Sequence, residues 1–239
     1  MKNFYSINQL IGWGLFGVAA TVYTLTVEPT ASFWDCGEYI AAAYRLQVTH
    51  PPGAPLFLLL ARMFSFLAGQ EVTKVAFWMN MSSALASAGS VMVVFWIISL
   101  LGRKAIGKTA QELQPHEASA IWGAGIVGAL ALTFCGTFWF TATETETYAF
   151  SILFTCLAIW AMLNWELIQD ARRAHRWLVL IAYLLGLSLG LRIFSLLTIP
   201  ALSLTFYFKR TERATLWGAT LALLVSGLLI IVILIAWPV

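Results

Sequence analysis

Charged side chains are scarce in this sequence of 239 residues. Asp, Glu, Lys and Arg make up 10% of it, whereas a soluble domain carries about 25%. Hydrophobic residues make up 60%, and the mean hydropathy is +0.82. So few polar groups cannot cover a water-soluble globule, and so many apolar ones exclude a disordered chain. The sequence therefore predicts an integral membrane protein, and its formal net charge of +3 gives no indication of nucleic-acid binding.

Cysteine and the common catalytic motifs are also lacking. The three cysteines, Cys36, Cys135 and Cys156, form no CxxC pair and no Cys/His spacing, which excludes a disulfide framework and a structural zinc site. No Walker loop, HExxH or GxSxG motif is present. A transporter needs a polar path across several spans, and the sequence offers none beyond Arg192. The acids instead flank the apolar segments, which favours chemistry at the membrane surface.

Long segments without Asp, Glu, Lys or Arg alternate with short charged ones. A helix of about 20 apolar residues crosses the hydrocarbon layer. The long segments predict spans at about 8–27, 76–101, 119–141, 148–166 and 215–236. Two shorter segments, 178–190 and 194–208, predict a short hairpin. We therefore expect an all-α polytopic membrane protein with a single transmembrane domain over 1–239.

Basic residues between these segments give the expected orientation. They form clusters at 103–108, 172–176 and 209–213, and cytoplasmic loops are enriched in Lys and Arg. If all three clusters lie in the cytoplasm, the chain must cross the membrane an even number of times between each pair. The segment between the second and third clusters must therefore form the hairpin, and the segment 46–61 must not cross the membrane. The loop 28–74 then lies outside, with juxtamembrane helices. The candidate site residues in the two outer loops are Asp35, Glu38, His50, Glu144 and Glu146.

Two carboxylates and a histidine occupy the first outer loop. Asp35 and Glu38 are three residues apart on a predicted amphipathic helix, so they share a face and can act as a base or bind a cation. Alternatively, Asp35 belongs to a capping box that starts at Ser32, which leaves Glu38 unexplained. His50 begins a His-Pro-Pro-Gly sequence, which by itself is typical of a stiff junction before a helix.

The second outer loop and the hairpin add three further candidates. Glu144 and Glu146 lie between two long spans, and a capping box from Thr143 explains Glu146 but not Glu144. Arg192 lies at the turn of the hairpin, where an arginine is costly unless it is paired or reaches water. It either snorkels to the interface or clamps an anion, because a guanidinium suits phosphate oxygens.

At these residues the sequence resembles a known family. The segments Glu28-Pro-Thr-Ala-Ser-Phe-Trp-Asp-Cys-Gly-Glu-Tyr39, His50-Pro-Pro-Gly-Ala-Pro-Leu56 and Thr143-Glu-Thr-Glu-Thr-Tyr148 look like the protein O-mannosyltransferase-like membrane family of Bacteroidota. More broadly, the chain resembles the GT-C superfamily of polyprenyl-phosphate-sugar-dependent glycosyltransferases. The resemblance implies a GT-C-like bundle with an outer juxtamembrane helix. It covers the N-terminal part of a family member, so we expect a further C-terminal region.

The resemblance also implies a reaction and roles for the site residues. A mannosyl or other hexosyl polyprenyl phosphate would donate its sugar to Ser or Thr hydroxyls of exported proteins. The active face would be the periplasmic side of a bacterial inner membrane. Asp35 would be the base, with Glu38 as the second catalytic carboxylate. The substrate-binding residues would be Tyr39, His50, Glu144, Glu146 and Arg192.

No cofactor or metal is expected, although clustered carboxylates also suit magnesium or manganese. Two other classes of function stay open at this stage. One is a structural subunit of an envelope or protein-export complex, with the export machinery as partner. The other is a transporter.

Overall fold

The computed structural model describes residues 2–51, 53–211 and 213–236, and these ranges contain helices and no strand. The prediction of an all-α polytopic membrane protein is confirmed. The α-helices are α1 (Lys2–Thr26), α2 (Cys36–Arg45), α3 (Pro55–Ser65), α4 (Val75–Ile106), α5 (Pro115–Thr133), α6 (Gly136–Ala142), α7 (Thr147–Leu167), α8 (Ala171–Leu189), α9 (Ile199–Arg210) and α10 (Leu216–Ala236). The short 3₁₀ helices are η1 (Phe66–Ala68), η2 (Val72–Lys74) and η3 (Ile193–Thr198).

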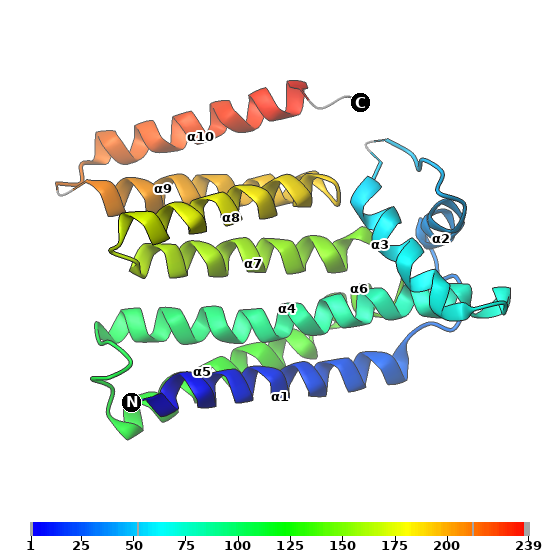
Figure 1. Ribbon diagram of the computed structural model, residues 1–239, viewed down its shortest axis with the longest axis horizontal. Coiled ribbons are helices and arrows are strands. Elements are labelled where there is room, and N and C mark those ends of the chain that lie inside the picture. Colours follow the sequence, from blue (N-terminus) through cyan, green and yellow to red (C-terminus); the bar gives the residue numbers. More distant parts are fainter. Residues whose placement is uncertain (1, 52, 212, 237–239) are drawn as a thin grey trace.

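Four helical segments in these ranges are long and apolar enough to cross a membrane: Phe4–Thr26, Val72–Ile106, Thr147–Leu167 and Leu216–Ala236. The pair α5 and α6 adds a fifth if its two bent parts form one span. Helices α8 and α9 run antiparallel beside them and are joined at one end by η3 (Figure 1). The segments expected as a short hairpin therefore form two helices joined by η3.

Helix α4 lies at the centre and packs against α1, α5 and α7. Its middle carries small buried residues, among them Ser83, Ala84, Ser87 and Ala88. Small side chains let helix backbones approach closely, which is how helices associate where water supplies no driving force. On α5, a Cβ at Gly125 would lie 2.8 Å from the ring of Phe95 in α4, so this contact requires a glycine.

The segment expected as one span at 119–141 is broken. Helix α5 ends at Thr133, and α6 starts at Gly136 at an angle of 67° to it. The Thr133 carbonyl accepts a hydrogen bond of 3.0 Å from the buried hydroxyl of Tyr23, so a side chain of α1 takes the place of the next helical N–H. The bend carries the chain toward the first loop, where the backbone N of Glu28 donates to the Thr143 carbonyl at 3.0 Å.

Helices α2 and α3 lie at one end of the bundle, beyond the ends of the long helices (Figure 1). The backbone N of Leu56, at the start of α3, donates to the Gly190 carbonyl at the tip of the hairpin at 2.9 Å. A Cβ at Gly190 would lie 3.0 Å from that of Leu56, which shows how closely the two segments approach. The first loop, the second loop and the hairpin tip therefore meet at one end of the molecule.

Candidate active site

The first loop places His50 between two acids. Glu38 lies in the first turn of α2, and Asp35 directly precedes this helix. Oε1 of Glu38 accepts a 2.7 Å hydrogen bond from the backbone N of His50, and Oε2 lies 2.9 Å from Nδ1 of the imidazole. Nε2 of the same ring is 4.0 Å from Oδ2 of Asp35. His50 therefore forms an acid–imidazole cluster with Asp35 and Glu38, in addition to its place in the loop before α3.

This contact changes the protonation of both partners. The hydrogen bonds from His50 lower the pKa of Glu38, and the hydrogen bond to Glu38 raises the pKa of His50. Glu38 is thus ionised, and His50 is favoured as an imidazolium. The carboxylate of Asp35 accepts no hydrogen bond from any residue that the structure describes, although it lies beside His50. Its lone pairs remain available to an incoming hydroxyl.

The second loop supplies two buried acids. Glu144 is 3% exposed and Glu146 is 6% exposed. Burial raises the pKa of Glu144, and one of its oxygens, Oε2, has no hydrogen-bond partner in the described part of the chain. Burial, then the charges of Glu144 and Asp35, raise the pKa of Glu146 to about 7, and Arg192 opposes this rise. Near neutral pH Glu146 can therefore gain or lose a proton.

We expect the stability of the protein to fall as the pH rises from 5 to 8. A carboxyl whose pKa is raised in the folded state binds a proton there that the unfolded chain releases, so stability is lost between the unfolded and folded values. A rise of the Glu146 pKa from 4.5 to about 7 corresponds to roughly 3 kcal/mol of unfolding free energy. Thermal unfolding of the purified protein across this range measures the loss, and Glu146→Gln should reduce it. An equally steep profile in Glu146→Gln would show that Glu146 does not titrate there.

The capping-box alternatives for the acids are wrong. Asp35 is the N-cap residue of α2 and Glu146 that of α7, but neither side chain caps its helix. Thr143 instead donates its hydroxyl to the Phe140 carbonyl at 3.0 Å. The carboxylates of Asp35 and Glu146 are thus not engaged in helix capping.

Arg192 lies between α8 and η3 and is held against the start of α7. Its Nη1 donates a 2.7 Å hydrogen bond to Oγ1 of Thr147, and its Cζ lies 3.7 Å from the centre of the Tyr148 ring. This contact with an aromatic face is favourable for a guanidinium. Arg192 is therefore positioned by α7, next to Glu146.

One cavity of about 720 Å³ brings residues of all three segments together. It is lined by Asp35 of the first loop, Glu144 and Glu146 of the second, and Arg192 of the hairpin tip. A neighbouring cavity of about 310 Å³ is lined by His50, Tyr39 and again Arg192. Of the predicted site residues, Glu38 lines neither cavity and reaches the site through His50. The loops therefore meet, with Arg192 on the wall between the two cavities.

Asn80 of α4 fixes the two loops to each other, a role that was not predicted from the sequence. Its Nδ2 donates to the carbonyls of Glu28 and Thr30 at 2.7 and 2.9 Å. Its Oδ1 accepts a hydrogen bond from the Thr145 hydroxyl. Asn80 and Thr145 are both fully buried, so water cannot replace the amide as the partner of the Thr145 hydroxyl. A single asparagine in the apolar run 75–102 was the signal that could have revealed it.

Replacement of Asn80 by Ala should destabilise the protein by about 3 kcal/mol, because the carbonyls of Glu28 and Thr30 and the buried Thr145 hydroxyl lose a partner at once. The melting temperature should fall accordingly. Ser90→Ala in the same helix is the control, since the buried Ser90 hydroxyl bonds only to the Ala86 carbonyl of its own helix among the described residues. Equal melting temperatures for the two variants would contradict the role given to Asn80.

A metal ion has one candidate set of ligands among the described residues. Ligand atoms of Asp35, Glu38 and His50 lie within 4.8 Å of one another, and all three residues are exposed. Both oxygens of Glu38 already contact His50. The set is thus internally paired, although carboxylates and an imidazole are donors that divalent cations accept.

Together these features define a helical membrane protein with carboxylates and an arginine around one cavity. Residues 35–215 match the family described as "Protein O-mannosyl-transferase TMEM260 N-terminal domain". The chain belongs to this family, and the match includes Asp35, Glu38, His50, Glu146 and Arg192.

Two relatives have the same printed name. "Protein O-mannosyl-transferase TMEM260" of Mus musculus is 29% identical over 175 residues, which are 73% of this chain and 22% of the relative. The protein of that name from Dictyostelium discoideum is 26% identical over 144 residues, 60% of this chain and 15% of the relative. The chain thus spans less than a quarter of the length of either. No solved structure gives a significant match.

Proposed function

We propose that this protein is a GT-C-type glycosyltransferase. It moves mannose or another hexose from a polyprenyl phosphate to Ser or Thr hydroxyls of exported proteins. One observation carries this proposal: the 720 Å³ cavity places Asp35, two buried glutamates and Arg192 around one space. The relatives named as protein O-mannosyl-transferases support the same reaction. We place the site on the periplasmic side of a bacterial inner membrane, as the positions of the basic clusters favour.

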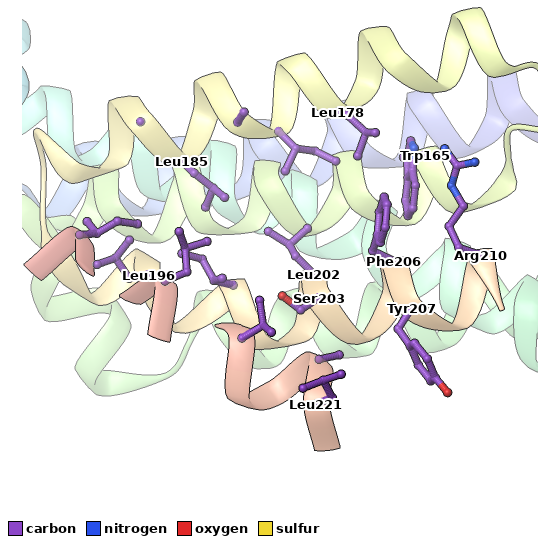
Figure 2. Close-up of a pocket in the computed structure, with 18 of the residues that line it drawn as sticks. Trp165, Leu178, Leu185, Leu196, Leu202, Ser203, Phe206, Tyr207, Arg210 and Leu221 are labelled. Atoms are coloured by element: carbon purple, nitrogen blue, oxygen red, sulfur yellow. The ribbon is translucent and has the colours of Figure 1, made fainter. Parts of the chain in front are cut away.

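Three neighbouring cavities with shared lining residues suit a lipid-linked donor. An apolar groove of about 760 Å³ runs between α8, α9 and α10, lined by Leu185, Leu196, Leu202 and Leu221 among others (Figure 2). Leu189 lines both this groove and the 310 Å³ cavity. The polyprenyl tail would occupy the groove, and the phosphate would reach Arg192. The sugar would then enter the 720 Å³ cavity, where Arg192 meets the acids.

The chemistry follows from this placement. Asp35 accepts the proton of the acceptor hydroxyl while the oxygen of that hydroxyl attacks the anomeric carbon. The bond from that carbon to the phosphate oxygen breaks with its electron pair, so polyprenyl phosphate leaves and the configuration inverts. Arg192 and the His50 imidazolium stabilise the charge on the departing phosphate. Glu38 holds His50, while Glu144, Glu146 and Tyr39 orient hydroxyl groups. This mechanism needs no metal.

A reconstituted reaction tests the proposal. The protein is placed in liposomes with a mannosyl polyprenyl phosphate and a Ser/Thr-containing acceptor peptide, and the peptide mass is followed. We expect a gain of one hexose on a hydroxyl side chain. Donor consumption without modification of the peptide would contradict a protein acceptor. If the donor is not consumed with any hexosyl polyprenyl phosphate, the glycosyltransferase assignment is wrong.

A further inference from the structure

A second polar cavity lies at the end of the bundle opposite to the candidate active site. It has a volume of about 210 Å³ and is lined by the first turns of α1, the end of α4 and the end of α7. These ends lie together, away from α2 and α3 (Figure 1). The proposed glycosyl transfer uses none of the residues around it.

Arg103 is the buried cation of this cavity. It is 7% exposed, its Nη1 donates to the Tyr5 hydroxyl at 3.0 Å, and its guanidinium lies 5.4 Å from the centre of the Tyr5 ring. No carboxylate of a described residue pairs with it, whereas nearby lysines have such partners. Lys104 pairs with Glu166 at 2.5 Å, and Lys108 with Glu117 at 2.6 Å. A buried charge that has only neutral partners is costly.

The other polar side chains around the cavity are neutral: Tyr5, Asn8, Gln9, Ser99 and Asn164. The Ser99 hydroxyl donates to Oδ1 of Asn8 at 2.5 Å, which leaves the amide NH₂ of Asn8 as a donor. Asn164 lines the same space and donates to the Trp160 carbonyl of its own helix at 2.7 Å. A buried cation among neutral amides and hydroxyls, which can donate hydrogen bonds, with no acid on the lining, matches an oxyanion.

We propose that this cavity binds a phosphate oxyanion on Arg103. A guanidinium presents a fork of N–H groups that fits two phosphate oxygens, and a bound phosphate would neutralise the buried charge. The cavity lies where α1, α4 and α7 end, and aromatic residues line it, as is typical of a membrane–water interface. The phosphate is carried either by an anionic phospholipid headgroup or by free inorganic phosphate. The site is separate from the proposed transfer reaction and does not depend on it.

Thermal unfolding of the detergent-purified protein tests this proposal and separates the two sources. The additives are short-chain phosphatidylglycerol, phosphatidylcholine of the same chain length, inorganic phosphate, and chloride at matched ionic strength. Stabilisation by phosphatidylglycerol above that by the other three identifies a lipid headgroup. Stabilisation by inorganic phosphate to the same extent identifies free phosphate. If no phosphate compound raises the melting temperature above chloride, the proposal is overturned.

Variants show whether the anion occupies this cavity. Arg103→Gln should weaken the apparent affinity for the stabilising phosphate compound tenfold or more, because charge-assisted hydrogen bonds are much stronger than neutral ones. Asn164→Leu keeps Arg103 but replaces one polar side chain of the lining by an apolar one, and it should also weaken binding, so the test does not depend on the folding of Arg103→Gln. Lys104→Gln, next to Arg103 but exposed, should bind as the wild type does. Wild-type affinity in both Arg103→Gln and Asn164→Leu would refute the site.

Discussion

Replacement of Asp35 by Asn should lower the rate of sugar transfer by about 10²–10⁴-fold, the range typical of a positioned general base. The amide has the shape of the carboxylate but cannot accept the hydroxyl proton at neutral pH. The melting temperature should stay close to that of the wild type, because the Asp35 side chain is exposed and accepts no hydrogen bond from a described residue. The measurement is hexose transfer to the acceptor peptide under saturating donor.

Glu71→Gln is the matched control for this experiment. Glu71 is an exposed acid of the same loop, pairs with Lys74 at 2.7 Å, and lines neither of the two cavities at the site. It should transfer sugar at the wild-type rate. Wild-type turnover in Asp35→Asn would show that another group takes the proton, and the buried Glu146 would then be the next candidate.

The helical fold could be predicted because charge-free runs determine where apolar helices form. The expected segment 76–101 lies within α4, and 215–236 nearly coincides with α10. The break between α5 and α6 could not be predicted in this way. It coincides with a hydrogen bond between Tyr23 and Thr133, which are 110 residues apart. Local composition carries no information about such a contact.

The residue types at the site could be predicted, but their contacts could not. Ionisable groups near apolar segments are costly, so their presence in two loops indicated function. The predicted capping boxes were wrong because a capping pattern indicates only which groups a side chain can reach. Tertiary contacts determine the hydrogen bonds that it makes. The role of Asn80 could not be predicted for the same reason. It lies in an apolar run, and its role depends on two loops that are distant in sequence.

Arg192→Gln should lower the rate constant for transfer by about 10²–10³-fold, the loss typical when one group that stabilises developing charge is removed. Arg192 lines both cavities at the site, so it is the positive group where the phosphate and the sugar would join. Arg192→Lys should recover part of the rate, because it keeps the charge but loses the forked geometry that matches phosphate oxygens. Arg62→Gln is the control, since Arg62 stacks on Tyr44 and Phe66 away from both cavities.

A second measurement on Arg192→Gln separates an electrostatic role from a purely structural one. Arg192 opposes the rise in the pKa of Glu146, so its removal should move the titration of Glu146 to a pH above 7. The pH-dependent loss of stability described for Glu146 should then extend to higher pH, and Arg192→Lys should restore the wild-type profile. A lower transfer rate without this displacement would mean that Arg192 only packs against Tyr148. A combined loss of rate and displacement would show that its charge acts inside the cavity shared with the acids.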